Sequence, residues 1–398
     1  MTSGSPIVRI FDNEEGVGLA WKGKVGEVAS KAGFDVQVIQ PAEFQKIKKC
    51  LSDRQEEFRK SREIKYEGCV LDETTLLIVD YNLLGPQEWI TGDTVAYLAR
   101  CFSRCGLIIG LNKFGANPFD LTLAGDIDSY CDFHIGSDQL SNPGLWGSTE
   151  YDFRPWHWPY LPAFMRDYEL RIEDVVKNPE ASICGFLGLE NLVDSMSPRT
   201  SSFLGEDPSS SEFADFIQVS QYGMSYKDRI TVKKDSGANR EAMSRIAAAR
   251  LSAWLEQVVL PAQCLLVDAP HLVGRFPSLL GKDDLSRPET WNQTVNLKEE
   301  ANLGIELKKI KKYGFPRSHW LSRSAWFWSG VSEDRGIDEA REPWVREPAK
   351  FGFCEDASKF REIEHCKPFI ADVDSVYVRR FAARFEGVNY APLARFMH

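Results

Sequence analysis

Two acidic side chains follow apolar segments in the N-terminal third of the chain. Asp12 comes directly after the run Ile7–Phe11, and Asp80 comes directly after the run Thr74–Val79. Short, uninterrupted apolar runs are typical of strands that are buried on both faces of a parallel sheet. The carboxyl ends of parallel strands line the crevice in which such sheets bind ligands. The sequence therefore predicts that Asp12 and Asp80 lie in this crevice.

A second pair with the potential for acid–base chemistry is Asp268 and His271, which follows the apolar run Cys264–Val267. A carboxylate three residues from a histidine at a strand end could orient it as a general base. No nucleophile motif of the GxSxG type lies nearby, however. We therefore favour a structural interpretation, in which Asp268 begins a loop and the hydrogen bonds of His271 are satisfied within the fold.

Two further carboxylates, Asp372 and Asp374, lie in the segment Phe369–Asp374, which reads as a strand. Alternate residues of a strand point to the same face, so the two acids would lie together. Metal sites usually need additional ligands or retained waters. These acids are the basis of one alternative function, a metal-dependent hydrolase or nuclease. The sequence offers further possible ligands in Cys354, Glu355, Asp356, His365 and Cys366. Their spacing is irregular and matches no known metal-ligand template.

The segment Glu306–Trp328 combines basic and aromatic side chains. Positive charge among stacking rings is the signature of phosphate or single-strand binding, and it supports a second alternative, a nucleic-acid-binding output domain. We do not favour nucleic acid as the partner, because lysine runs are common on solvated helix faces and tryptophan-rich runs are common in cores. The candidate contacts are Lys308, Lys309, Lys311, Lys312, Arg317 and Arg323, interleaved with Tyr313, Phe315, Trp320, Trp326 and Phe327.

Residues 147–163 are rich in proline and aromatic residues and are too apolar for a flexible linker. One interpretation is an aromatic platform for a base or a partner peptide. We favour a rigid connector packed between two domains, because an exposed cluster of this size would promote aggregation. The rings of this expected interdomain clamp are Trp146, Trp156, Trp158 and Tyr160, with His157 among them.

Strand and helix patterns alternate through the N-terminal third, which predicts an α/β fold: a doubly wound sheet of five parallel strands. A mixed α/β region is expected to follow, with a long amphipathic helix over Asn239–Val259 that Pro261 ends. The expected organisation is a domain at 6–146, the connector at 147–163, and an effector or interaction region at 164–398. The predicted strands are 7–11, 36–39, 74–79, 107–111 and 132–135, and the predicted helices between them are 17–32, 42–65 and 92–104.

The N-terminal third, residues 6 to about 146, resembles the receiver domains of bacterial response regulators. The resemblance rests on strand order, on the acidic residues after the first strand and on Asp80 at the end of the third. In that family paired acids hold magnesium, and the aspartate that ends strand three accepts a phosphoryl group from a histidine kinase. Matched residue by residue, Asp12 corresponds to the first acid and Asp80 to the phospho-acceptor, and Glu14 is the nearest candidate for the second acid.

The chain departs from the receiver pattern at three places. Asn13 stands where the second acid is expected, strand four ends in Asn112 rather than a hydroxyl, and strand five ends in Gly136 without the lysine that neutralises phosphate. Lys113 follows strand four instead. A phosphoryl group carries a charge of about −2, so acids without a cationic partner should hold it poorly. The resemblance therefore implies a degenerate receiver with a vestigial pocket.

The net charge, the cysteine spacing and the lengths of the apolar runs exclude several classes of protein. The chain has 398 residues, a net charge of −10 and nine cysteines with no CxxC spacing. The cysteine spacing argues against a zinc ribbon, a thioredoxin-like motif and a secreted disulfide scaffold, and the charge argues against a general polyanion-binding surface. It has no signal-peptide pattern and no apolar run of membrane-spanning length. We expect a cytoplasmic regulatory or assembly protein without a cofactor, in a bacterial signalling or antiphage conflict system. Its expected partner is a protein, plausibly a kinase-like ATPase.

Overall fold

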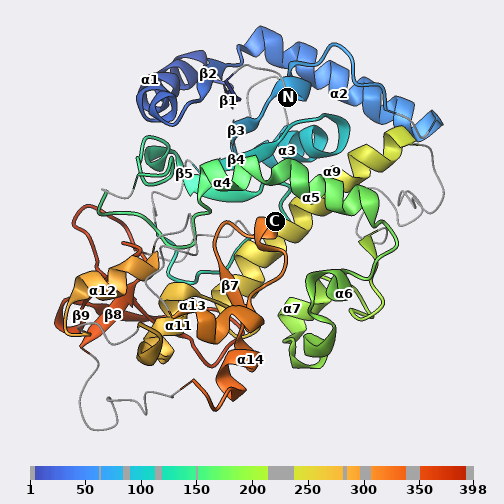
Figure 1. Ribbon diagram of the computed structural model, residues 1–398. Helices are drawn as coiled ribbons and strands as arrows, with labels where there is room; N and C mark the ends of the chain where they lie inside the picture. Colours follow the sequence, from blue (N-terminus) through green and yellow to red (C-terminus); the bar gives the residue numbers. More distant parts are fainter. Residues whose placement is uncertain are drawn as a thin grey trace.

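Five strands of the N-terminal part form one sheet in which every strand runs parallel to its neighbours, in the order β2-β1-β3-β4-β5 (Figure 1). This confirms the predicted fold class, and the order is that of flavodoxin-like doubly wound sheets. The strands of the sheet are β1 (Ile7–Phe11), β2 (Asp35–Val38), β3 (Leu76–Asp80), β4 (Leu107–Asn112) and β5 (Phe133–Gly136). The computed structural model describes residues 5–61, 64–83, 90–112, 119–148, 151–213, 237–280, 285–295, 306–337 and 350–390.

Alternate residues of each central strand pack into two different cores. Ile78 joins a cluster with Trp21 of α1, whereas Leu77 and Val79 join a second cluster with side chains of α2 and α3. This is the expected result for a pleated sheet with helices on both faces. The helices that cover the two faces are α1 (Glu15–Lys31), α2 (Pro41–Ser61) and α3 (Gly92–Phe102).

Local signals in the sequence set the ends of these helices. Pro41 begins α2, a position where its fixed φ and missing N–H cost nothing. Thr91 caps α3 by accepting a hydrogen bond from the backbone of Thr94. Gly33 follows α1 at a φ of +89°, which favours glycine. Helix α2 ends at Ser61, earlier than the predicted residue 65.

The C-terminal part combines a mixed sheet with short helices. Its four strands have the order β10-β11-β8-β9. The strands are β8 (Phe351–Cys354), β9 (Lys359–Glu362), β10 (Lys367–Ile370) and β11 (Arg379–Ala382). In this sheet β11 runs parallel to β8, and the other two pairings are antiparallel.

A separate antiparallel pair joins β6 (Leu266–Asp268) to β7 (Ala325–Phe327). The helices are α4 (Leu161–Arg166), α5 (Tyr168–Lys177), α6 (Ile183–Leu187), α7 (Pro198–Ser202), α9 (Gly237–Trp254), α10 (Leu260–Ala262), α11 (Ala269–Arg275), α12 (Pro288–Asn292), α13 (Leu307–Ile310) and α14 (Trp328–Glu333).

The longest C-terminal helix differs from its prediction at both ends. It begins at Gly237 rather than at Asn239, and a π-helical turn over Leu255–Val259 leads directly into α10. Pro261 therefore does not end the helical segment. It lies in the first turn of α10, where the missing N–H of proline is tolerated. The preceding π-helical turn, in which the backbone is wider, joins α9 to α10.

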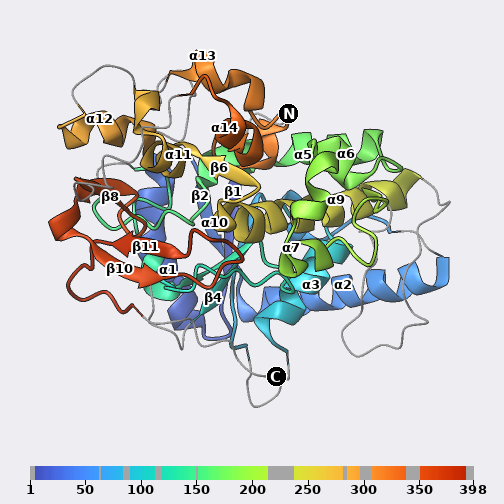
Figure 2. The same ribbon diagram turned by 90° about the horizontal axis from the view of Figure 1, so that it is seen from below.

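The hydrophobic core runs without interruption from the sheet into the C-terminal region. One cluster contains Ile78 of β3, Trp156 of the connector and Phe369 of β10. Seen from below, α9 lies against both α3 and α5, which belong to different parts of the chain (Figure 2). Among the described residues, no helix combines the length and the apolar character needed to cross a membrane.

Candidate functional site

Asp12 and Asp80, the acids that the receiver resemblance singles out, lie at neighbouring strand ends. Strands β1 and β3 pair with Phe11 opposite Val79, so Asp12, which directly follows β1, comes next to Asp80, the last residue of β3. Both side chains are buried, at 1% and 0% exposure. Asp12 Oδ1 accepts a hydrogen bond from the backbone N–H of Glu14 at 2.7 Å. The carboxyl edge of the sheet therefore brings the two acids together at its topological switch point.

The ends of β4 and β5 carry the departures from the receiver pattern that the sequence shows. The Glu14 side chain is exposed, and β5 ends in Gly136 opposite Asn112, with Ser137 next in the chain. Lys113 lies outside the described residues. Helix α3 begins directly against the backbone of Asp80. The approach is so close that a Cβ on Gly92 would clash with the Asp80 carbonyl oxygen. Glycine at this position allows the close approach.

The aromatic rings of the connector face inward. Trp146, Trp156 and Trp158 are 4%, 2% and 5% exposed, and Tyr160 is partly buried. Gly147 has a φ of +101°, and a Cβ there would lie 2.7 Å from the Tyr160 ring. The connector backbone also pairs with the C-terminal sheet region, because the Trp156 N–H donates to the Glu355 carbonyl at 2.6 Å. Buried rings in such contacts favour the clamp over the open platform.

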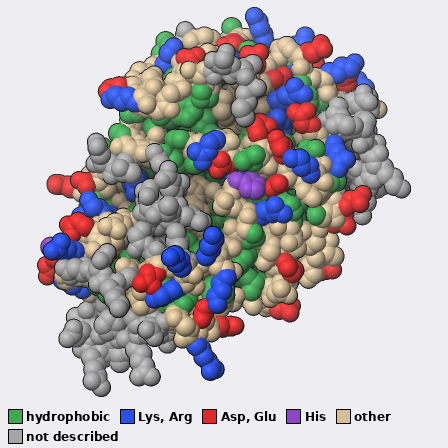
Figure 3. Space-filling model, in the orientation of Figure 1, with side chains coloured by type: hydrophobic (Ala, Val, Ile, Leu, Met, Phe, Trp, Pro, Cys, Tyr) green, Lys and Arg blue, Asp and Glu red, His purple; other side chains and the backbone are tan. Residues whose placement is uncertain are grey.

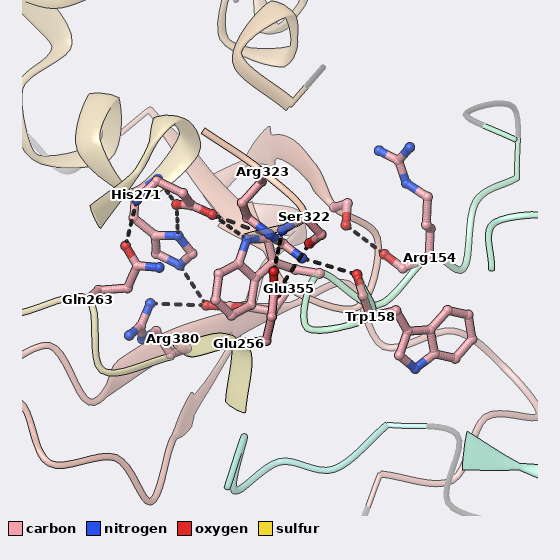
Figure 4. Close-up of polar contacts among 12 residues, drawn as sticks. Arg154, Trp158, Glu256, Gln263, His271, Ser322, Arg323, Glu355 and Arg380 are labelled. Carbon is pink, nitrogen blue, oxygen red and sulfur yellow. Dashed lines mark hydrogen bonds and ion pairs between the residues drawn. The ribbon is translucent and has the colours of Figure 1, made fainter. Parts of the chain in front are cut away.

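A buried network of charged side chains lies next to Trp156 (Figure 4). Its centre is His271 of α11. The His271 Nδ1 atom lies 2.6 Å from Asp268 Oδ1, and Nε2 lies 2.9 Å from Glu355 Oε1. Trp156 Nε1 donates to Asp268 Oδ2 at 2.6 Å. Connector, β6, α11 and the turn after β8 therefore meet at one imidazole ring.

Two guanidinium groups complete the network. Arg380 of β11 donates to Glu355 Oε1 at 3.2 Å and to the carbonyl of Pro261 at 2.7 Å. Arg323 donates to the carbonyl of Trp158 at 3.1 Å and lies 3.8 Å from Asp268 Oδ2. Its guanidinium also packs over the Trp156 ring, 4.7 Å from the centroid. Each buried carboxylate is thus matched by a buried cation, which is the condition under which such charges are tolerated.

The electrostatics of Asp268 reflect this balance. Burial alone raises its pKa, but the charge and hydrogen bond of His271, together with Arg323 and the Trp156 indole, outweigh burial and hold the pKa below its usual value. Both His271 nitrogens already face carboxylate oxygens, so neither is available to take a proton from a substrate. The arrangement supports the structural interpretation of the pair. Sequence analysis grouped Asp268 with His271 but did not connect either residue with Glu355, which is distant in sequence.

An open pocket of about 1210 Å³ lies between the connector, α12 and β9. Its lining carries both signs of charge, with Arg154 and Lys359 on the basic side and Glu289 and Glu362 on the acidic side. Burial, and then the neighbouring charge of Arg323, lowers the pKa of Arg154 below its usual value. A lining of mixed sign gives no electrostatic preference for an anion or a cation.

The basic segment divides into an exposed and a buried half. Lys308, Lys309, Lys311 and Lys312 are exposed, and two of them pair with acids, Lys309 with Glu306 and Lys312 with Asp334. In Figure 3, acidic side chains lie among the basic ones over this part of the surface. The expected stacking rings Trp320, Trp326 and Phe315 are buried. Arg317 packs on the Phe186 ring, and Arg323 belongs to the buried network, so Arg323 does not lie on the lysine surface.

We expect no appreciable binding of single-stranded oligonucleotides to the wild-type protein, because the expected stacking rings Phe315, Trp320 and Trp326 are buried. Replacement of Lys308, Lys309, Lys311 and Lys312 by glutamate should then change nothing in a fluorescence anisotropy titration at low salt. Micromolar binding by the wild type that weakens steeply with salt and is lost in the fourfold variant would contradict this expectation.

Asp372 and Asp374 do not share a strand face. Strand β10 ends at Ile370, because the backbone of Asp372 donates to the Thr122 carbonyl at 2.8 Å instead of continuing the ladder. Both acids are exposed, and both contact α7: Arg199 lies 3.7 Å from Asp372, and Ser197 donates to Asp374 at 2.7 Å. The expectation of two acids on one strand face is therefore wrong.

His157 makes the stability of the connector dependent on pH. Burial lowers its pKa to about 4, and Asp120 and Glu355 offset this only in part. The pKa of an unperturbed histidine is about 6.5, so between pH 6.5 and 4 the unfolded chain binds a proton that the folded chain does not. The free energy of unfolding should fall over this interval as pH is lowered, by at most about 1.4 kcal/mol per pH unit from this group. Urea unfolding of His157→Phe should show a flatter pH dependence than the wild type, and an unchanged slope would contradict the assignment.

Two groups of side chains within the described residues could hold a metal ion. One is the exposed set Glu362, Glu364 and His365, and the other is the partly buried set Asp93, Cys131 and His134. Of these six residues the sequence-based candidates include His365 alone, although Cys131 and His134 have the CxxH spacing that often marks metal ligands. Asp93 is distant in sequence and could be added only from the fold.

No protein-family model matches the chain, and comparisons with curated proteins and with solved structures give no match either.

Proposed function

We propose that the chain is a regulatory or assembly protein whose receiver-like N-terminal unit docks a protein partner, in a bacterial signalling or antiphage conflict system. The observation that carries the proposal is the carboxyl edge of the sheet. There Asp12 and Asp80 lie side by side, while β5 ends in Gly136 and Ser137 rather than in a lysine. A sheet edge that keeps both acids but has no lysine at the end of β5 suits a surface that binds a partner irrespective of phosphorylation.

The outer face of α1 is the docking surface that we favour. Leu19 is 49% exposed there. Gly16, Gly23 and Gly26 lie on the same helix, and a Cβ at any of them would meet nothing within 4 Å. Each glycine in a helix interior costs about 1 kcal/mol relative to alanine, and internal packing does not require these three. Their absence of side chains would instead let a partner element approach the helix backbone closely.

The experiment that tests this proposal compares two matched surface variants. Leu19→Asp changes α1, and Leu170→Asp changes α5 in the C-terminal region, where Leu170 is 48% exposed. Full-length protein and both variants are used to capture partners from the native host, and the partners are identified by mass spectrometry. We expect a protein partner, plausibly a kinase-like ATPase, that the wild type and Leu170→Asp retain and Leu19→Asp loses. A partner retained equally by all three proteins would contradict docking through α1.

Phosphorylation of Asp80 tests the other half of the proposal. Because no lysine follows β5, we expect incubation with acetyl phosphate and magnesium to leave the protein unmodified. The intact mass is measured by mass spectrometry, with Asp80→Asn as the control. A stable increase of roughly 80 Da, the mass of one phosphoryl group, that disappears in Asp80→Asn would show a functional receiver instead.

A further inference from the structure

Three side chains with different metal-binding chemistry meet near Gly110 of β4, between the N-terminus of α3 and β5. Asp93 lies in the first turn of α3, Cys131 precedes β5, and His134 lies within β5. One ligand atom from each lies within 4.8 Å of the other two. The His134 Nε2 and Asp93 Oδ1 atoms are 4.0 Å apart. This group is separate from the Asp12–Asp80 pocket and from the buried network around His271.

Neighbouring residues keep the space around this group open and polar. Ser129 Oγ donates to Asp93 Oδ1 at 3.1 Å and lies 3.4 Å from His134 Nε2. Gly110 of β4 pairs with His134 in the sheet. A Cβ on Gly110 would lie 2.7 Å from His134 Nε2 and 3.1 Å from Cys131 Sγ. Glycine within a strand often marks a close approach, and here it leaves room for two ligand atoms above the strand.

We propose that Asp93, Cys131 and His134 form a zinc-binding site, with Ser129 Oγ or a water as the fourth ligand. Thiolate, imidazole and carboxylate are the donors that zinc prefers, and four ligands satisfy its tetrahedral geometry. Zn–ligand lengths of about 2.0–2.3 Å place the ligand atoms of such a site roughly 3.4–3.6 Å apart. The three side chains would therefore need to close by only about 1 Å. A thiolate and a carboxylate together neutralise the charge of the ion.

The two ligand side chains on either side of Cys131 are partly open to solvent. Asp93 and His134 retain 25% and 19% exposure of their side chains, which gives an ion a route from solvent.

A zinc ion here would link two elements that no strand pairing joins. It would tie the N-terminus of α3 to β5, the edge strand of the sheet. The adjacent residue Gly92 lies against the Asp80 carbonyl, so the ion would also fix the wall of the vestigial pocket. This role is independent of the partner that docks on α1.

Titration of the metal-free full-length protein with Co²⁺ tests the site. Cobalt replaces zinc in tetrahedral sites, and a bound thiolate gives a charge-transfer absorption in the near ultraviolet. We expect one equivalent of Co²⁺ to produce this band, Zn²⁺ to abolish it, and binding near neutral pH to release protons. We also expect the thermal midpoint to rise when Zn²⁺ is added.

Variants separate this site from other cysteines and from the second ligand group. Cys131→Ser, His134→Ala and Gly110→Ala should lose the band, the last because its Cβ displaces the ligands. Cys50→Ser, which changes a thiol on α2, and His365→Ala, which changes the exposed group, should keep it. Circular dichroism establishes that each variant is folded. Absence of the band in the wild type, or its persistence in folded Cys131→Ser, would overturn the proposal.

Discussion

Replacement of Trp156 by alanine should lower the free energy of unfolding by about 3–5 kcal/mol, the range observed for large buried aromatic residues. Three interactions are lost at once. The ring is 2% exposed, its Nε1 donates to Asp268, and its face packs against Arg323. Chemical denaturation followed by fluorescence and circular dichroism gives the change, because the unfolding midpoint falls while the denaturant dependence stays similar.

Trp156→Phe separates packing from hydrogen bonding at this position. Phenylalanine keeps most of the buried ring but leaves Asp268 Oδ2 without the indole donor, so we expect a smaller loss of about 1–3 kcal/mol. A near-wild-type unfolding curve for Trp156→Ala would end the clamp interpretation. We would then search for a ligand that stacks on Trp156 and Trp158.

Replacement of Glu355 by alanine should destabilise the protein by about 3–5 kcal/mol, because it leaves buried positive charge without its partner. Glu355 is 1% exposed and accepts hydrogen bonds from both His271 and Arg380. Loss of this carboxylate affects α11 and β11 together, since it joins them. Thermal and urea unfolding near pH 7 measure the effect.

Glu364→Ala is the matched control for this experiment. Glu364 is a nearby glutamate whose side chain is 71% exposed and whose pairing with His365 is at the surface. Surface pairs of this kind contribute little, so we expect a change within about 0.5 kcal/mol. Equal effects of the two substitutions would show that the buried network does not hold the C-terminal region together.

The free energy of unfolding at acidic pH should also depend on this network. The pKa of Asp268 is lower in the folded protein than its usual value. Its carboxylate therefore stabilises the fold at pH values above about 4, and this contribution is lost as pH falls through the lowered pKa. His157 acts in the same direction over the higher interval, so acid weakens the connector and its buried partners in two steps.

The N-terminal sheet could be predicted because its signals are local. Each buried strand is a short apolar run, and residues such as Pro41 and Gly33 mark helix boundaries within a few positions. The neighbouring positions of Asp12 and Asp80 followed from strand ends and parallel topology alone. Periodicity and turn chemistry carry this information without any knowledge of distant contacts.

The C-terminal sites could not be predicted in the same way, because distant residues complete them. Asp268 and His271 are three residues apart, but Glu355 and Arg380 reach them only through the fold. The apolar pattern after Phe369 suggested a longer strand, whereas a hydrogen bond from Asp372 to Thr122 ends it. The positions of Lys308 and Trp320 in the sequence do not show that the lysine is exposed and the tryptophan ring is buried. Tertiary context determines which of these side chains meets solvent.

The continuous core has a consequence for the order in which the chain is synthesised. Ala242 and Ile246 of α9 complete the cluster that covers one face of the N-terminal sheet. Ribosomes add about 5–20 residues per second, so roughly 5–20 s pass between the emergence of β5 and that of α9. During this time the apolar cluster beside α3 lacks these two side chains. The protein should therefore depend on ribosome-associated chaperones for longer than a receiver-like unit with a complete core of its own.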